Sequence, residues 1–108
     1  MNTKTVKEVA VVELTGEIDA STAPKIQAQV LPLTQSNNKI ILDLSGVSYM
    51  SSAGLRVLLS LYRQTTAKNG NLVLVGLSED IEDTMSVTGF LNFFTVCKTL
   101  DSGLAALK

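Results

Sequence analysis

Two adjacent hydroxyl residues, Ser51 and Ser52, stand between two apolar segments of the chain. Residues 39–44 form a short run rich in β-branched residues, which is typical of a buried strand. Over residues 55–62 apolar side chains recur at helical spacing. The serines are therefore expected at or just before a helix N-terminus, where free N–H groups favour a negatively charged group such as phosphate. Serine is also a favoured N-cap, and the two roles are compatible if Ser51 caps the helix and Ser52 faces outward.

Asp19 and Asp43 are the best candidates for a catalytic pair, although an aspartate at a strand end is usually a turn residue. The chain has no histidine, which removes the usual general base and zinc ligand. It also lacks a glycine-rich phosphate loop and a convincing cluster of metal ligands. We therefore predict a protein that is not an enzyme, with no catalytic residues, no cofactor and no metal site.

Length and charge restrict the function further. The 108 residues match one ordinary domain, predicted to span 1–108. The nine basic and ten acidic residues are scattered and give a net charge of −1, which disfavours direct nucleic-acid binding. No apolar run approaches the roughly 20 residues needed to cross a bilayer, and residues 1–8 lack signal-peptide features. We expect a cytoplasmic protein without membrane contact, in which the single cysteine, Cys97, is a buried thiol.

The elements that must position the serines follow from hydrophobic patterns. The predicted strands are residues 3–6, 9–14, 39–44, 72–75 and 93–97, and the predicted helices begin near Ser21 or Thr22, near Ser51, at Glu79 and at Asp101. Strands that alternate with helices indicate right-handed crossovers. We therefore predict an α/β fold with a mostly parallel sheet of about four to five strands, an antiparallel N-terminal edge and about four helices.

Local signals predict where several elements begin or end. Gly16 is expected to end the first long strand, and the Ser45–Gly46 turn signal is expected to close the central strand. Pro32 should end or bend the first helix. Ser78 is the expected cap of the third helix, and Gly89 its left-handed stop.

The order of elements, together with residues 49–59, resembles the STAS domain, specifically the bacterial anti-sigma factor antagonist family, over essentially the whole chain. The family's loop pattern of glycine, acidic residue, apolar residue and aspartate is matched by residues 16–19. Its phosphorylation loop, commonly an aspartate followed by two hydroxyl residues, glycine and leucine, is matched by residues 51–55. The first hydroxyl of that pair falls on Ser52, whereas Ser51 replaces the family's aspartate and Ala53 the second hydroxyl.

The resemblance implies a phosphorylation switch. Ser52 would be phosphorylated by an anti-sigma factor serine/threonine kinase, and the unphosphorylated chain would bind that kinase and release a sigma factor. A serine phosphatase would reverse the switch, and the chain would be a monomer or weak dimer. The implied partner-binding residues are Asp19, Ser51, Ser52, Ala53, Gly54 and Arg56.

Several alternatives remain open. The first alternative to an anti-sigma factor antagonist is a STAS-type phosphorylatable regulator in a pathway with no sigma factor, and a small nucleotide-binding domain is a weaker alternative. Arg56 and Arg63 are more often solvated helix residues than ligands. Gly54 is expected to let the helix start approach a neighbouring segment closely. Phe93 and Phe94 are adjacent, so one of them is expected to stay partly exposed, where it would suit a dimer or partner contact.

Overall fold

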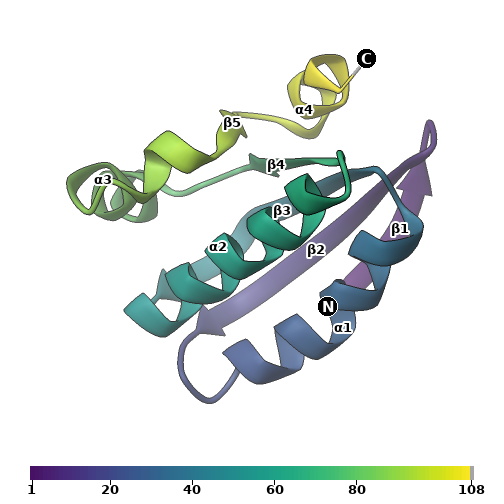
Figure 1. Cartoon of the computed structure of the whole chain (residues 1–108). Helices are drawn as coiled ribbons and strands as arrows, with labels where there is room; N and C mark the ends of the chain where they lie inside the picture. Colours follow the sequence, from purple (N-terminus) through teal and green to yellow (C-terminus); the bar gives the residue numbers. More distant parts are fainter. Residues whose placement is uncertain (108) are drawn as a thin grey trace.

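The computed structural model describes residues 1–107, which form one five-stranded sheet and four α-helices (Figure 1). The elements are β1 (Asn2–Val6), β2 (Val9–Ile18), α1 (Ala23–Ser36), β3 (Lys39–Met50), α2 (Ser52–Ala67), β4 (Asn71–Val75), α3 (Glu79–Val87), the 3₁₀ turn η1 (Phe90–Phe93), β5 (Thr95–Cys97) and α4 (Leu100–Ala106). The strands lie in the order β1-β2-β3-β4-β5. Only β1 runs antiparallel to its neighbour among these strands, which confirms the predicted α/β fold.

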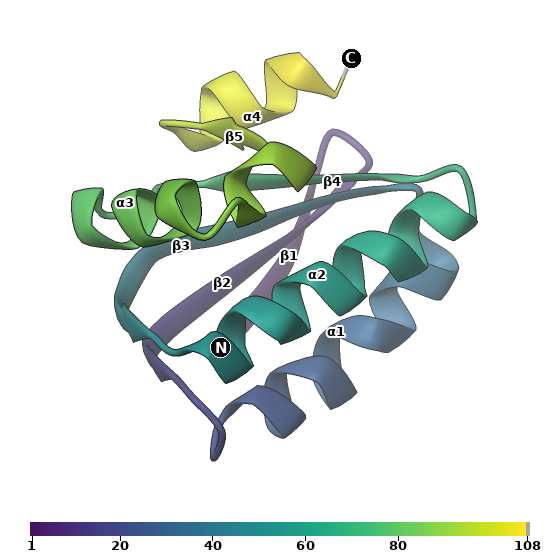
Figure 2. The same ribbon diagram turned by 60° about the vertical axis from the view of Figure 1, so that its left-hand side comes forward.

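Helices cover both faces of the sheet. Helices α1 and α2 lie side by side on one face, and α4 lies on the other (Figure 2). Successive residues of β3 alternate between the two cores: Ile40 and Leu42 face α1 and α2, whereas Ile41 faces α4. Residues 9–14 of β2 and 40–44 of β3 are apolar at nearly every position because both faces of the sheet are buried there.

Both central strands extend beyond their predicted ends. Gly16 does not end β2, and Ser45–Gly46 does not close β3, because the two strands stay paired from Thr15↔Gly46 to Ile18↔Met50. The pairing accommodates the turn signals through two register shifts, between Glu13 and Thr15 and between Gly16 and Glu17, at each of which β3 contains one residue more than β2. Gly16 itself has a φ of 80°. A Cβ on Gly46 would lie 2.8 Å from Thr15 Cγ2, so this glycine permits a close approach of the strands. Because both strands are longer than predicted, the loops that follow them begin only at Asp19 and Ser51, at the carboxyl ends of the parallel strands.

The helix boundaries are mostly as predicted. Ser78 caps α3, its Oγ accepting from Ile81 N at 3.2 Å, and Gly89 follows with a φ of 82°. Pro32 does not end α1, which continues to Ser36. Proline has no N–H to donate to the carbonyl four residues earlier. Because Pro32 lies on the exposed side of the helix, water can bind that carbonyl instead. No helix within residues 1–107 is long and apolar enough to cross a bilayer.

The last strand is shorter than predicted. Phe93 belongs to η1, and β5 begins only at Thr95, because η1 occupies the preceding chain. The expectation that one aromatic of the adjacent pair stays exposed is confirmed: Phe93 is 49% exposed, whereas Phe94 is half-buried against Tyr62. Cys97 is half-buried, so the predicted buried thiol is wrong.

Candidate functional site

The candidate site lies where β2 and β3 end together. Ile18 and Met50 form the last pair of the parallel register, and Ser51 N donates to Ile18 O at 2.8 Å. Asp19 and Ser51 therefore leave neighbouring strands at the same carboxyl edge of the sheet. In open α/β sheets this edge is the usual place for recognition, since loops gather there on a rigid support.

Ser51 is the N-cap of α2. Its backbone is extended, with φ −83° and ψ 175°, and its Oγ accepts from Gly54 N at 3.5 Å. That distance is at the long end for a hydrogen bond, so the cap is a weak one. The side chain is half-buried and directed toward the helix backbone rather than the solvent.

Ser52 is the first residue of α2 and is exposed. Within residues 1–107 its Oγ makes no hydrogen bond to another protein group, which leaves the hydroxyl accessible from solvent. No acidic residue lies in the first turn of α2, so the positive end of the helix dipole is not offset there. The expected division between a capping and an outward-facing serine is present.

Gly54 holds α2 against both strand ends. A Cβ at this position would lie 2.8 Å from Ile18 Cγ2, 2.8 Å from Met50 Cγ and 2.9 Å from Ile18 O. The expected close approach is confirmed, and the contact includes a backbone oxygen that cannot rotate away. Gly54 is buried between α2 and the strand ends, so it positions the helix start rather than forming part of the exposed surface. Ala53, the preceding residue, is half-buried.

Asp19 organises the loop between β2 and α1. Its Oδ1 accepts from Ser21 Oγ at 2.7 Å, from Ser21 N at 2.9 Å and from Thr22 N at 3.2 Å. The Ser21 hydroxyl, followed by the backbone N–H groups of Ser21 and Thr22, lowers the pKa of the Asp19 carboxyl. Every hydrogen bond that the carboxylate accepts from residues 1–107 goes to Oδ1, so Oδ2 accepts none from this part of the chain.

Thr22 occupies the N-cap position of α1, one of the two predicted cap residues, yet its hydroxyl does not cap that helix. Instead, Thr22 Oγ1 accepts from Asp19 N and donates to Glu17 O, both at 2.9 Å. The hydroxyl therefore ties the end of β2 to the start of α1. Together with the Asp19 bonds, it gives this exposed loop a defined conformation.

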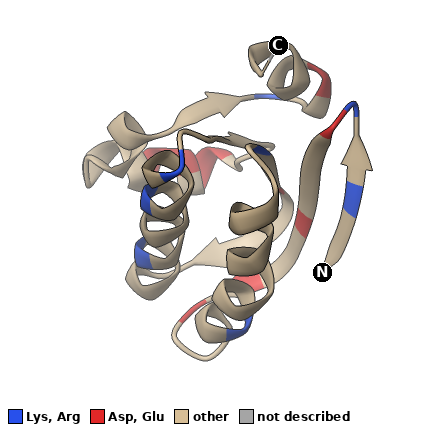
Figure 3. Ribbon diagram, turned by 45° about the vertical axis from the view of Figure 1, so that its right-hand side comes forward, with Lys and Arg blue, Asp and Glu red and all other residues tan. Residues whose placement is uncertain are grey.

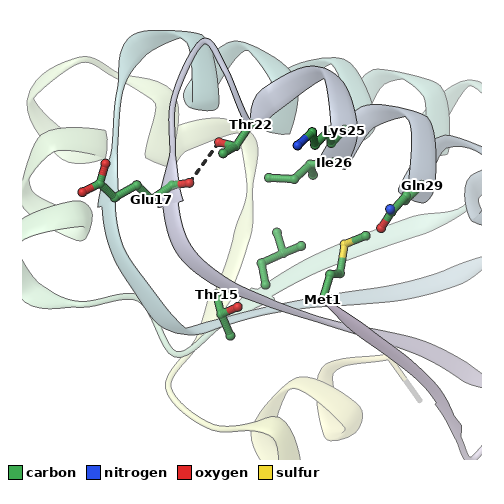
Figure 4. A pocket seen from close by; sticks show the side chains of 8 residues that line it. Met1, Thr15, Glu17, Thr22, Lys25, Ile26 and Gln29 are labelled. Carbon is green, nitrogen blue, oxygen red and sulfur yellow. Dashed lines mark hydrogen bonds between the residues drawn. The ribbon is translucent and has the colours of Figure 1, made fainter.

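A hollow of about 260 Å³ lies beneath this loop, between β2 and α1 (Figure 4). Leu14 and Ile26 give it an apolar wall, and Lys25 and Gln29 of α1 supply polar groups. Met1 also lines the hollow, so its walls come from the start of the chain as well as from β2 and α1. Sequence reasoning missed it because these segments are brought together only by tertiary packing.

The alternative catalytic pair is not formed. Asp43 lies in the middle of β3, where its Oδ1 accepts from Ser45 N at 3.0 Å, as a turn-forming aspartate does. The seven residue-to-residue steps from Asp43 to Met50 span roughly 20 Å of strand, so Asp43 and Asp19 are far apart. Within residues 1–107 no three potential metal ligands of the His, Cys, Asp or Glu type cluster together.

Arg56, the remaining predicted contact residue, is exposed one turn after Ser52. The structure therefore brings Asp19, Ser51 and Ser52 to one edge of the sheet and places Arg56 on the adjoining helix surface. Glu17 and Tyr49, which form a register pair just before this edge, are also exposed. Both lie within the motifs that the sequence analysis quoted, but neither was predicted as a contact residue.

Comparisons with known proteins agree with this architecture. The sequence profile of the STAS domain matches residues 1–103. The chain is 37% identical over 83 residues to an anti-sigma-B factor antagonist of Listeria monocytogenes, covering 75% of this chain and 72% of that protein. It is 29% identical over 93 residues to the anti-sigma-B factor antagonist of Bacillus subtilis, covering 86% and 85%. A crystal structure of an anti-sigma factor antagonist from Mycobacterium paratuberculosis superposes with a TM-score of 0.89 at 28% identity, covering 98% of this chain and 91% of that chain.

Proposed function

Because the chain belongs to the STAS domain family, among the anti-sigma factor antagonists, we propose that it binds an anti-sigma factor and thereby releases a sigma factor. The proposed partner is a serine/threonine kinase as well as an anti-sigma factor. The unphosphorylated chain is the binding form, and phosphorylation of Ser52 switches it off. A serine phosphatase restores the binding form.

The observation that carries this proposal is the exposed Ser52 hydroxyl at the start of α2. A kinase must bring the acceptor oxygen into line with the γ-phosphorus of ATP, which requires a hydroxyl that is accessible and not engaged elsewhere. Ser51 performs the capping role, so Ser52 is free for the reaction.

The proposed step is an ordinary phosphoryl transfer. The Ser52 Oγ–P bond forms while the bond between the γ-phosphorus and the bridging oxygen of ATP breaks, and ADP leaves. The hydroxyl proton passes to a base of the kinase. The product carries about −1.5 to −2 charges at neutral pH, held where the N–H groups of the first helical turn favour an anion.

The phosphate acts on the partner rather than on the fold. It adds charge and bulk at an edge that already carries the ionised Asp19 carboxylate. A partner group placed against this edge meets repulsion and a desolvation cost. Since about 1.4 kcal/mol corresponds to a tenfold change in affinity, a modest penalty is sufficient for switching.

Phosphosite mapping and binding measurements test the proposal. Incubation with the copurifying kinase and ATP should place phosphate on Ser52, as mapped by mass spectrometry. In a pull-down or by calorimetry, Ser52→Ala should bind the kinase like the unmodified chain, whereas Ser52→Asp should bind more weakly. Ser86→Asp, at an exposed serine of α3, controls for added charge and should bind normally. Phosphate found only on other residues, or equal binding by Ser52→Asp, would refute the assignment.

The sigma factor is tested by what copurifies. A tagged chain isolated from its native cell should recover an anti-sigma factor kinase whose sigma factor is displaced when the chain is added. Recovery of only non-sigma signalling components would instead support a STAS-type regulator of another pathway, with Ser52 still the switch.

A further inference from the structure

A row of side chains on the outer surface of α2 continues from Ser52 along the helix. Ser52, Arg56, Leu59 and Arg63 are spaced by four, three and four residues. At about 100° per residue they fall within a sector of roughly 60°, so they share one side of the helix. Arg56 and Arg63 are exposed, and Leu59 is half-buried between them. We call this set the Arg56–Arg63 stripe.

The charge of the stripe is not balanced within the described chain. Helix α2 contains no aspartate or glutamate, and Figure 3 shows this helix with basic segments and no acidic ones. Within residues 1–107 the one ion pair joins Lys4 Nζ and Glu13 Oε1, over 3.4 Å. Neither guanidinium is engaged by a carboxylate, so both are available to one outside the chain.

The surface along the stripe is hollowed. A depression of about 330 Å³ is lined by Arg56, Leu59, Ser60, Arg63 and Gln64. Leu59 is the one apolar residue of this lining, and the polar side chains surround it. Guanidinium groups bind carboxylates through paired N–H donors, so this surface suits acidic side chains flanking a small apolar contact.

We propose that the Arg56–Arg63 stripe is a docking surface for an acidic segment of the partner protein. This inference rests on the proposed function, because it assigns the α2 side of the same partner interface. Charge complementarity identifies the occupant: two unpaired guanidiniums face outward on a helix without acidic residues. Nucleic acid fits less well, because two arginines on a chain of net charge −1 fall far short of a basic surface that tracks a phosphate backbone.

The position of Ser52 gives the stripe a regulatory consequence. Ser52 lies one helical turn from Arg56, at the i and i+4 spacing at which opposite charges on a helix surface interact. A phosphate on Ser52 therefore competes with the acidic segment of the partner for Arg56. Phosphorylation therefore adds about −1.5 to −2 charges to the docking surface, and the phosphate pairs with the Arg56 guanidinium that the partner would otherwise bind.

Charge reversal tests the stripe. The probe is the anti-sigma factor kinase that copurifies with the tagged, unmodified chain, and dissociation constants are measured by calorimetry at low and physiological salt. The double variant Arg56→Glu/Arg63→Glu should bind at least about tenfold more weakly at low salt. This difference should shrink at physiological salt, because salt screens the attraction in the unmodified chain and the repulsion in the variant. Arg56→Lys/Arg63→Lys keeps both charges and should stay within about threefold. Lys7→Glu/Lys98→Glu changes the net charge equally at exposed sites outside α2 and should bind normally.

The outcomes separate the inference from the function beneath it. If the unmodified chain binds no kinase, the proposed function fails and the stripe falls with it. If Ser52→Asp weakens binding while Arg56→Glu/Arg63→Glu binds as tightly as the control variant Lys7→Glu/Lys98→Glu, the proposed function stands and the docking role of the stripe is refuted. Circular dichroism and urea unfolding of each variant exclude loss of the fold as the cause. A labelled DNA duplex serves as a second probe, and tight binding that is abolished only by the arginine reversal would identify nucleic acid as the occupant and overturn the proposal.

Discussion

Ser51 N donates to Ile18 O over 2.8 Å, and this bond joins the two loops of the candidate site. Ile18 precedes the Asp19 loop, and Ser51 precedes α2, so the bond extends the pairing of β2 and β3 by one step beyond Ile18↔Met50. The acidic loop and the Ser52 hydroxyl are therefore fixed to the same sheet edge. A partner meets the two as one preformed surface, which reduces the ordering cost of binding.

The first prediction concerns Gly54. Alanine is the better helix former by about 1 kcal/mol, but its Cβ would lie within 2.9 Å of Ile18 O and within 2.8 Å of Ile18 Cγ2. The backbone oxygen cannot move without disturbing β2, so we expect the steric clash to cost more than the gain in helix propensity. Gly54→Ala should reduce the free energy of unfolding by about 1–2 kcal/mol, and Gly54→Val by more, in urea denaturation.

Ser52→Ala provides the control in the same helical turn, because its side chain is exposed. Its stability should stay within about 0.5 kcal/mol of the unmodified chain. A Gly54→Ala variant that is as stable as the unmodified chain would contradict the close packing of α2 on the strand ends.

The second prediction separates the two serines. Ser51→Ala removes the N-cap of α2 and should cost about 0.5–1 kcal/mol, the lower part of the usual range, because its bond to Gly54 N is long at 3.5 Å. Ser51→Asp keeps a capping oxygen and adds charge favoured by the helix dipole, so it should be neutral or stabilising. Urea unfolding measures both. If Ser52→Ala rather than Ser51→Ala destabilised the chain, Ser52 would be the cap, and its hydroxyl would not be free for phosphorylation.

The third prediction concerns the Asp19 carboxyl. Hydrogen bonds from the Ser21 hydroxyl, Ser21 N and Thr22 N lower its pKa in the folded state. A folded pKa below the unfolded one stabilises the fold fully above the unfolded value of about pH 4, and this stabilisation is lost as the pH falls through the folded pKa. The stability gap between the unmodified chain and Asp19→Asn should therefore shrink on acidification. Carbon-detected NMR titration reads the pKa directly.

Ser21→Ala is the matched variant for that titration. It removes the largest cause of the shift and leaves both backbone donors in place, so the pKa of Asp19 should rise toward its ordinary value without reaching it. An unchanged pKa in Ser21→Ala would mean that the Ser21 hydroxyl does not hold the carboxylate.

Local patterns were sufficient for much of the fold. The sequence analysis placed β4, α3 and the caps around Ser78 and Gly89 correctly, because each is determined by neighbouring residues. It ended β2 and β3 too early because Gly16 and Ser45–Gly46 are turn residues by local preference. Here the pairing of Thr15 with Gly46, which are distant in sequence, overrides that preference.

The site was predictable where a short motif describes it. Ser51 as cap and Ser52 as exposed hydroxyl follow from their place before an apolar helical pattern. The Asp19 loop also has a local signal, since an aspartate followed by hydroxyl residues two and three positions later favours an Asx-type turn. The hollow between β2 and α1 and the unpaired charge of α2 have no such signal, because both depend on what surrounds them in three dimensions.

The last prediction concerns the phosphorylated chain and needs no partner. With phosphoserine incorporated at position 52, the second phosphate pKa should lie below its usual value of about 6, because Arg56 at i+4 and the helix N-terminus both favour the dianion. Arg56→Gln should raise this pKa, as followed by ³¹P NMR titration. Arg63→Gln is the control, since its charge lies roughly 16 Å farther along the helix than residue 52 and is largely screened at physiological salt. Equal shifts of the phosphate pKa in both variants would indicate a general effect of net charge and would contradict a specific pairing between the phosphate and Arg56.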